Sequence, residues 1–323
     1  NVPIGLLLAA LAPLYITESE RQPGRFDLAG ALTSTAGMVA LVYGFISAAH
    51  DGWSNLATVG SFTAAAVLLA VFFSIETRTS QPITPLHMFA DRNRAGAYAI
   101  MLSLAAALFG MFFFLTLFVQ DVLGYSPLRA GFAFLPVSAA IIGSSQFAAR
   151  SLPRIGPRRL MTAGAVLGTV GLAWLTQISV TSGYVTGILG PMLVFGVGMG
   201  LLFVPLTITA VSGVAPHEAG AASSLLNVMQ QVGGSLGLSI LVTAFGTASR
   251  NEAASQVAQL LRGGPPEAQA QLQQTGQLPA ALADQVLAHG ISTAFQLSVV
   301  FAALALAVAL VVIRTRAPAA AES

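Results

Sequence analysis

The 323-residue sequence contains no cysteine and no lysine. Without cysteine there can be no disulfide bond, no thiolate metal site and no cysteine nucleophile. Without lysine there is neither a phosphate-binding GxxxxGK[ST] loop nor an amine that could form a Schiff base. These absences exclude ATP hydrolysis through such a loop, as well as Schiff-base chemistry with retinal or pyridoxal phosphate, and we expect no cofactor.

Charged residues of either sign are also scarce, at 8% of the chain, whereas an ordinary soluble domain carries about a quarter. Hydrophobic residues make up 55%, and the mean hydropathy is +0.78. Several uncharged apolar runs reach the length of about 20 helical residues that crosses a hydrocarbon core of roughly 30 Å. The sequence therefore predicts an all-α polytopic membrane protein with eight complete spans, at residues 27–49, 56–75, 95–119, 128–149, 160–178, 185–206, 219–245 and 292–313.

The first apolar run, residues 2–16, is too short to span a membrane comfortably. It begins at Asn1, without an initiator methionine or the basic flank of a signal peptide. We interpret residues 1–17 as the end of a severed transmembrane helix, and we expect the chain to be the C-terminal portion of a longer protein.

The arginines predict the orientation, because short cytoplasmic loops are enriched in basic residues. One set of alternate loops holds eleven of the 14 arginines: Arg21, Arg25, Arg78, Arg92, Arg94, Arg150, Arg154, Arg158, Arg159, Arg314 and Arg316. We assign that side to the cytoplasm, together with the C-terminal tail at 314–323. The long segment 246–290 then becomes an extracytoplasmic loop, broken near Gly263 into two short amphipathic pieces. We expect it to be surface-lying helix or partly disordered. The basic balance follows from this topology and indicates no nucleic-acid partner.

The sequence gives little support for an enzyme. The four histidines lie in or beside loops and are far apart, which argues against a metal site: His50, His87, His217 and His289. The neighbours of His50 and His217 are acidic, but adjacent residues on a helix end point in different directions, so spacing alone predicts no catalytic dyad. The glycine-rich stretch FGVGMG, at 195–200, lies inside a span with no preceding strand, which favours helix packing over a nucleotide loop.

Small residues and prolines recur within the spans. Two glycine sets each share a helix face, where they suit either static packing or helix movement: Gly30, Gly37 and Gly44, and Gly164, Gly168 and Gly171. Three prolines lie within spans and should loosen the backbone ladder: Pro136, Pro191 and Pro205. Broken helices beside a central cavity are used by secondary transporters, although channels and enzymes contain them too.

One apolar stretch carries unexpected amides. LLNVMQQVGGSLGLSI, at 225–240, places Asn227, Gln230 and Gln231 at helical spacing i, i+3 and i+4. Polar side chains facing lipid are costly, so this face should look into a bundle. Two interpretations stay open, namely hydrogen bonding to a neighbouring helix, worth roughly 1 kcal/mol, and lining of a cavity.

Four motifs, in order along the chain, resemble the fourteen-helix drug:proton antiporter branch of the major facilitator superfamily. NVPIG at 1–5 resembles a motif in its sixth helix, and LGYSPLRAG at 123–131 resembles its loop between helices nine and ten. LPRIGPRRL at 152–160 is similar to its basic loop between helices ten and eleven, and HEAGAASSLLNVMQQVGGSLGLSI at 217–240 resembles the opening of helix thirteen. The last motif is the most specific. The helix count agrees with the resemblance, because the severed helix would be the sixth and the eight complete spans would be helices seven to fourteen.

The resemblance implies a fold and a division of the chain. Residues 27–75 would be the extra transmembrane hairpin inserted between two six-helix bundles, and residues 95–313 would be the C-terminal six-helix bundle. The partner would be the missing N-terminal six-helix half, and the location would be a bacterial inner membrane with several crossings.

The resemblance also implies which helices line the central cavity, namely those at 95–119, 128–149, 185–206 and 219–245. The amides lie in the last of these, with Ser223, Gly234 and Gly237 along a stripe. Aromatic and flexible side chains elsewhere in these helices would suit a loosely specified apolar or cationic compound, although such residues are more often packing. The candidates for the cavity are Asn227, Gln230, Gln231, Met111, Phe112, Phe114, Phe134 and Gln146.

On this basis we expect part of a secondary active exporter that exchanges protons for hydrophobic, often cationic, small molecules. The alternatives are an exporter of an endogenous metabolite, such as a lipid, siderophore or self-made antibiotic, and a polytopic membrane enzyme. None of the twelve acidic residues lies deep in a predicted span, so the proton-coupling carboxylate should lie in the missing half. Asp121, at the outer mouth of a cavity helix, is the one candidate for proton coupling in this chain. The alternative for Asp121 is a capping or interfacial role.

Overall fold

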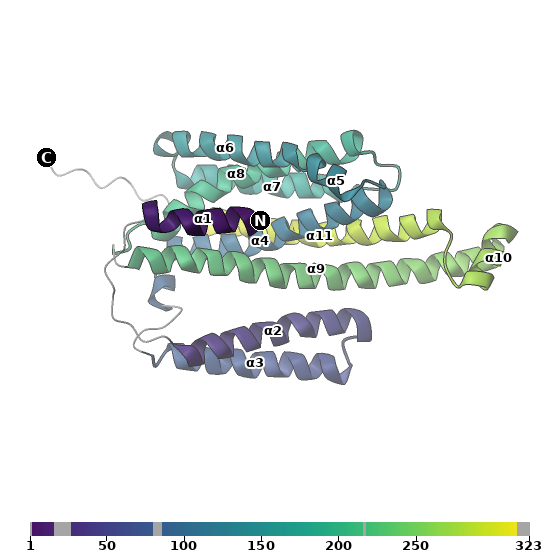
Figure 1. Ribbon diagram of the computed structural model, residues 1–323, viewed down its shortest axis with the longest axis horizontal. Coiled ribbons are helices and arrows are strands. Elements are labelled where there is room, and N and C mark those ends of the chain that lie inside the picture. The colour runs from purple at the N-terminus through teal and green to yellow at the C-terminus, as the bar shows by residue number, and fades with distance from the viewer. Residues whose placement is uncertain (1, 16–26, 80–85, 216–217, 315–323) are drawn as a thin grey trace.

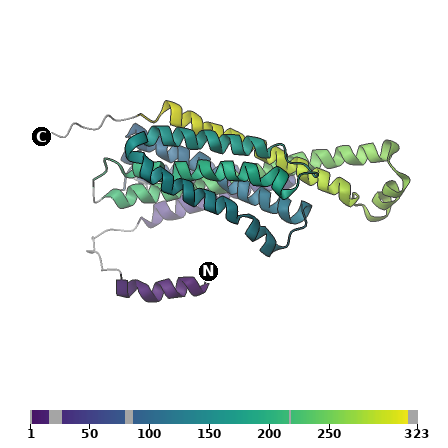
Figure 2. The same cartoon turned by 90° about the horizontal axis from the view of Figure 1, so that it is seen from above.

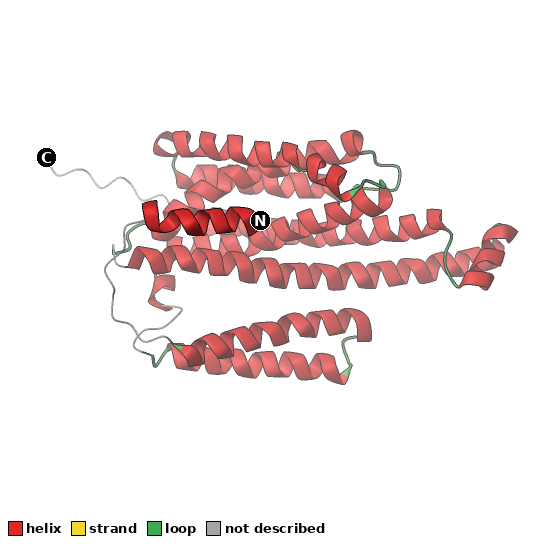
Figure 3. Cartoon of the chain, in the orientation of Figure 1, coloured by secondary structure: helices red, strands yellow, loops and turns green. Residues whose placement is uncertain are grey.

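The computed structural model describes residues 2–15, 27–79, 86–215 and 218–314, and all structural statements below concern these residues. Their regular structure is entirely helical (Figure 3), which confirms the all-α expectation. The long helices are α1 (Val2–Tyr15), α2 (Leu28–Asp51), α3 (Leu56–Glu76), α4 (Arg92–Leu117), α6 (Leu135–Ile155), α7 (Pro157–Leu175), α8 (Gly190–Val211), α9 (Ala219–Gly263) and α11 (Ala280–Val311). The shorter segments are η1 (Leu86–Phe89), η2 (Phe118–Val122), α5 (Pro127–Ala133), η3 (Tyr184–Leu189) and α10 (Pro266–Thr275).

The helices form a bundle with a separate hairpin beside it. Within the bundle α4 packs on α9, α8 packs on both α6 and α7, and α11 touches α4, α7 and α9. The α2–α3 hairpin lies next to α9, which it meets through α2 (Figure 1). Helix α1 stands apart from the bundle (Figure 2).

Seven of the described helical segments are long and apolar enough to cross a membrane. Eight spans were predicted, and the predicted span at 160–178 is the one that falls short. It corresponds to α7, a helix of only 19 residues that begins with Pro157, Arg158 and Arg159. Because any stretch of membrane-spanning length in α7 must include both arginines, its average polarity is higher, although α7 packs on α8 and α11 as a full member of the bundle.

Helix α9 is longer than the sequence predicts. The apolar run ends near Phe245, but the helix continues to Gly263, over 45 residues in all. Residues 246–290, expected to be surface-lying helix or partly disordered, are mainly helical, comprising the end of α9, α10 and the first turns of α11. The expected break beside Gly263 is present. Alanine and glutamine favour helix without being apolar enough for the membrane, which explains why the helix continues beyond the apolar run.

Glycines set the closest contacts between helices. A Cβ atom added to Gly233 would overlap the backbone carbonyl of Leu102, so α4 and α9 touch backbone to backbone. On α7, the expected glycine face is in close contact with α8, since a Cβ on Gly164 would lie 2.6 Å from the carbonyl oxygen of Gly198. In the hairpin, a Cβ on Gly37 would lie 3.0 Å from the side chain of Leu69. Such close approach is how helices associate in lipid, where burial of apolar surface provides no drive.

Two of the three prolines coincide with irregular backbone, as expected. Pro136 follows the break between α5 and α6 at Phe134. Pro191 follows η3, a π-helical segment that widens the helix where proline cannot donate a hydrogen bond. Pro205 lies inside α8 without ending it.

Candidate functional site

The amides on α9 lie on the surface of the bundle. Asn227 and Gln231 are exposed and Gln230 is half-buried. Among the described residues, none of the three has a side-chain hydrogen bond to a neighbouring helix. The exposed polar row on this face is Ser224, Asn227, Gln231 and Ser235, at helical spacing. The interpretation of these amides as a hydrogen-bonded link between helices therefore has no support in the geometry.

The glycines further along the same helix are covered by α4. Gly237 packs against Ala106 of α4, and a Cβ on Gly234 would lie 2.9 Å from the ring of Phe109. The stripe that the sequence predicted as one cavity-facing surface is thus divided, because Gly234 and Gly237 form a helix contact while the amides remain open.

The aromatic run on α4 is divided in the same way. Met111 and Phe114 are fully buried, and the Phe114 ring lies 5.4 Å from that of Phe245 and 6.3 Å from that of Phe295. These two candidates are packing residues of the bundle core. Phe113, which was not a candidate, is exposed at the surface.

An open pocket of about 350 Å³ lies at the end of α4 and in η2. Its lining combines aromatic, hydroxyl, amide and carboxylate groups, from Phe112, Phe113, Thr116, Leu117, Gln120 and Asp121. Phe134 approaches it from the α5–α6 junction, with its ring 5.5 Å from that of Phe112. The structure therefore brings Phe112, Phe134 and Asp121 together, which the sequence could not show.

Asp121 is an exposed carboxylate on η2. In the described part of the chain it forms no ion pair. The nearest basic residue along the chain, Arg129, instead places its guanidinium carbon 3.8 Å from the ring centre of Tyr125. π-Helical segments such as η2 are frequent at functional sites. An uncompensated carboxylate beside two phenylalanine rings can attract an organic cation.

Gln146 does not join the other candidates. It is exposed on α6, which packs mainly on α8, whereas the amides lie on α9. The two helices occupy opposite sides of the bundle (Figure 1). A single cavity can include both only if it extends across the whole face of the bundle.

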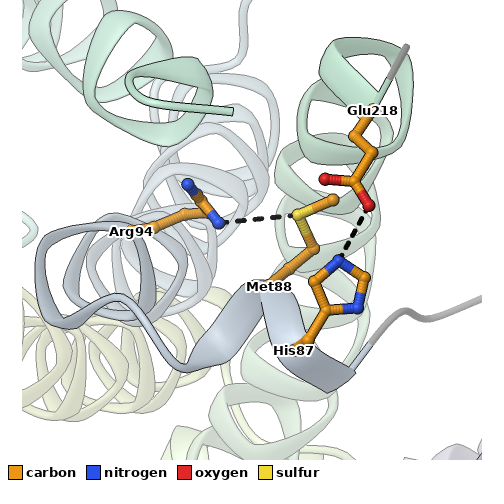
Figure 4. A network of polar contacts seen from close by, with 4 residues as sticks. All are labelled: His87, Met88, Arg94 and Glu218. Carbon is orange, nitrogen blue, oxygen red and sulfur yellow. Dashed lines mark hydrogen bonds and ion pairs between the residues drawn. The ribbon is translucent and has the colours of Figure 1, made fainter. Parts of the chain in front are cut away.

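The end of the bundle opposite η2, which we call the arginine end, carries a polar network that the sequence analysis missed. His87 Nε2 lies 3.0 Å from Glu218 Oε1, and Arg94 Nη1 lies 3.6 Å from the sulfur of Met88 (Figure 4). Arg94, assigned above to a loop, is buried within the first turn of α4 and donates from Nη2 to the carbonyl of Ser212 at 3.4 Å. The network links the ends of α4, α8 and α9.

At the arginine end, arginine side chains also donate hydrogen bonds to the backbone at the end of α11. Arg92 donates to the carbonyls of Val311 and Val312 at 2.6 and 3.1 Å, and Arg158 donates to that of Leu310 at 2.9 Å. These carbonyls belong to the last helical turn, which lacks partners within its own helix, and cations are favoured at this negative end of the helix dipole. Arginines from separate predicted loops thus lie at one end of the bundle.

The described residues hold no group of three or more side chains suited to binding a metal ion.

The sequence profile of the Major Facilitator Superfamily matches residues 1–238. The chain is similar to the puromycin resistance protein of Streptomyces alboniger, at 38% identity over 75% of this chain and 49% of that protein. It is also similar to the cephamycin export protein of Amycolatopsis lactamdurans (35% identity, 76% of this chain, 52% of that protein) and to the tetracenomycin C resistance and export protein of Streptomyces glaucescens (33%, 75% and 45%). The chain spans about half the length of these curated relatives.

Proposed function

This chain belongs to the major facilitator superfamily, and from that premise we propose that it forms part of a secondary active exporter of hydrophobic or cationic small molecules, driven by proton antiport. Its bundle would supply one wall of the substrate cavity, and a second six-helix bundle would supply the other. Transporters of this kind bind their substrate between two such units near the middle of the bilayer.

One observation carries the proposal. Asn227 and Gln231 are exposed on a membrane-spanning helix, and neither is bonded to another helix of the described structure. Because polar side chains facing lipid are costly, their face is best explained by contact with water or with another protein unit. A wet cavity between two bundles provides both.

The aromatic pocket at η2 supports the same substrate class. Phe112 and Phe113 offer apolar ring surface, while Asp121 supplies the negative charge. The three relatives are named for resistance to, or export of, puromycin, cephamycin and tetracenomycin C. Export of one endogenous natural product is therefore the second candidate, and a binding assay across compound classes would separate it from multidrug export.

The orientation belongs to the proposal as well. We place the arginine end in the cytoplasm of a bacterial cell, following the bias of basic residues to that side. We also place the proton-coupling carboxylate in the other bundle. In this chain, Asp121 lies at the end opposite the arginine end, and the buried Glu76 ends α3 in the hairpin.

The test uses the full-length protein with Asn227→Ala and Gln231→Ala, and with Gln259→Ala as the control. Gln259 is an exposed amide on the same helix, but beyond the apolar run. The two cavity variants should change the relative resistance to different compounds at an unchanged protein level, and the control should not. A uniform loss of resistance that parallels a loss of folded protein would contradict the proposal.

A further inference from the structure

Between the hairpin and the bundle lies an open cavity that plays no part in the proposed substrate path. It has a volume of about 450 Å³ and lies between α2, α9 and α11. Next to it, the hydroxyl of Thr243 lies 3.0 Å from the carbonyl oxygen of Phe45 on α2 and 2.8 Å from that of Ser239 in its own helix, so its single proton is shared between the two. The lining residues are Phe45, Trp53, Ile240, Thr243, Ala244, Thr247, Ala248, Asn251, Thr293 and Leu297.

The cavity is polar at one end and apolar at the other. Helices α9 and α11 run in opposite directions, and Gly290 of α11 lies against Ser249 of α9, which sets the level of each residue along the bundle. Ile240 and Leu297 therefore lie together at the inner end. Thr247, Asn251 and Thr293 lie nearer the tip of the hairpin.

The polar end coincides with features of a membrane interface. Trp53, in the turn of the hairpin, is 59% exposed and stacks on Phe62 at 6.1 Å. Tryptophan is enriched at this level of the bilayer. Arg250 donates to Thr247 Oγ1 at 3.3 Å, which places a positive charge beside the cavity. On the hairpin side, Asp51 accepts a hydrogen bond from Ser47 of its own helix at 3.2 Å.

We propose that this cavity binds a phospholipid of the surrounding bilayer. One acyl chain would lie against Phe45, Ile240 and Leu297, and the glycerol and phosphate would lie against Thr247 and Asn251, within reach of Arg250. The polarity of the cavity matches that of a lipid along its length. An empty cavity would forfeit the dispersion contacts of its walls, and ordered water needs two to four polar partners that the apolar end does not offer.

The lipid would act as part of the joint between the hairpin and the bundle. The hairpin meets α9 mainly through α2, so the bound molecule would enlarge this contact. The volume falls in the range of about 300–1,000 Å³ that is typical of small-molecule sites.

Tryptophan fluorescence can test the proposal because the chain has only two tryptophans, Trp53 and Trp174. A Trp174→Phe variant of this chain leaves Trp53 as the reporter, in bilayers containing phospholipid brominated near the carboxyl end of its acyl chains. Ala248→Phe fills the cavity from α9, and Thr293→Leu fills it from α11. Ala254→Phe, at an exposed position of α9 outside the cavity, is the matched control. Trp174, read in a Trp53→Phe background, reports whether each variant keeps its fold.

We expect both filling variants to lose part of the Trp53 quenching while the control retains it, with the Trp174 signal unchanged in all three. Arg250→Gln should reduce any excess quenching by brominated phosphatidylglycerol over brominated phosphatidylcholine. Equal Trp53 quenching in both filling variants and the control would overturn the proposal, since Trp53 would then report only the general lipid around the protein. Loss of the headgroup difference alone, without a filling effect, would also overturn it, because no lipid would then occupy the cavity.

Discussion

The contact between α4 and α9 should be among the most sensitive points of the bundle. In Gly233→Ala, the new Cβ would lie 2.8 Å from the carbonyl carbon and the Cα of Leu102. Carbon atoms pack at about 3.5–4.0 Å, so the helices must separate by roughly 0.7 Å or more. The neighbours are backbone atoms, which cannot rotate away as a flexible side chain would.

The cost can be worked out from two opposing terms. Overpacking costs about 1–3 kcal/mol, and a backbone neighbour places this site near the upper end. Replacing glycine by alanine within a helix returns roughly 0.5–1 kcal/mol. The net loss is about 2 kcal/mol, which lowers the ratio of folded to unfolded protein about thirtyfold.

Gly220→Ala is the matched control, because Gly220 lies in the first turns of the same helix with open space around its Cβ position. Titration with sodium dodecyl sulfate, followed by circular dichroism of the purified chain in mixed micelles, should unfold Gly233→Ala at a lower detergent fraction than wild type. The control should match or exceed wild type. Equal midpoints for the two variants would refute the argument that backbone contact between α4 and α9 sets the stability.

Three further predictions concern topology, coupling and packing. Cysteine placed at Ser54 should react with an impermeant thiol reagent outside intact cells while cysteine at Pro157 stays unlabelled, because the two positions lie at opposite ends of the bundle; the reverse labelling would invert the orientation. In the full-length protein, Asp121→Asn should keep dye efflux driven by an imposed pH gradient, and loss of efflux with intact substrate binding would assign the essential proton site to this chain. Gly200→Ala should lower stability in the same detergent titration by about 1–3 kcal/mol, because the added methyl group would overlap α6, whereas Gly143→Ala, with open space, should not.

The sequence predicted the helical class and the family because both depend on long apolar runs and ordered motifs. It could not predict how each helix is rotated. In lipid all sides of a helix can be apolar, so no amphipathic pattern distinguishes the core face from the others. Consecutive residues also turn by 100° each, which is why Phe113 is exposed while Met111 and Phe114 are buried.

The sequence also could not predict contacts between residues that are far apart along the chain. Glu218 was considered beside its neighbour in the sequence, but its partner in the structure is His87, 131 residues away. For Asn227 the sequence predicted only that the amide faces something other than lipid, and it left open whether this is a neighbouring helix or a cavity. On the proposed arrangement it would face the second bundle, which no local pattern in this chain encodes.

The hydrogen bonds between Arg92 and the end of α11 have a consequence for biosynthesis. The two partners are 220 residues apart, so α4 is made well before the last turn of α11. At about 5–20 residues per second, roughly 11–44 s separate the synthesis of donor and acceptor. During that interval α4, α7 and α9 stand in the membrane without the helix that touches all three. The newly made chain therefore passes through a stage in which the surfaces of α4, α7 and α9 that α11 later covers are still exposed. A chaperone or insertase that shields these surfaces would raise the yield of folded protein.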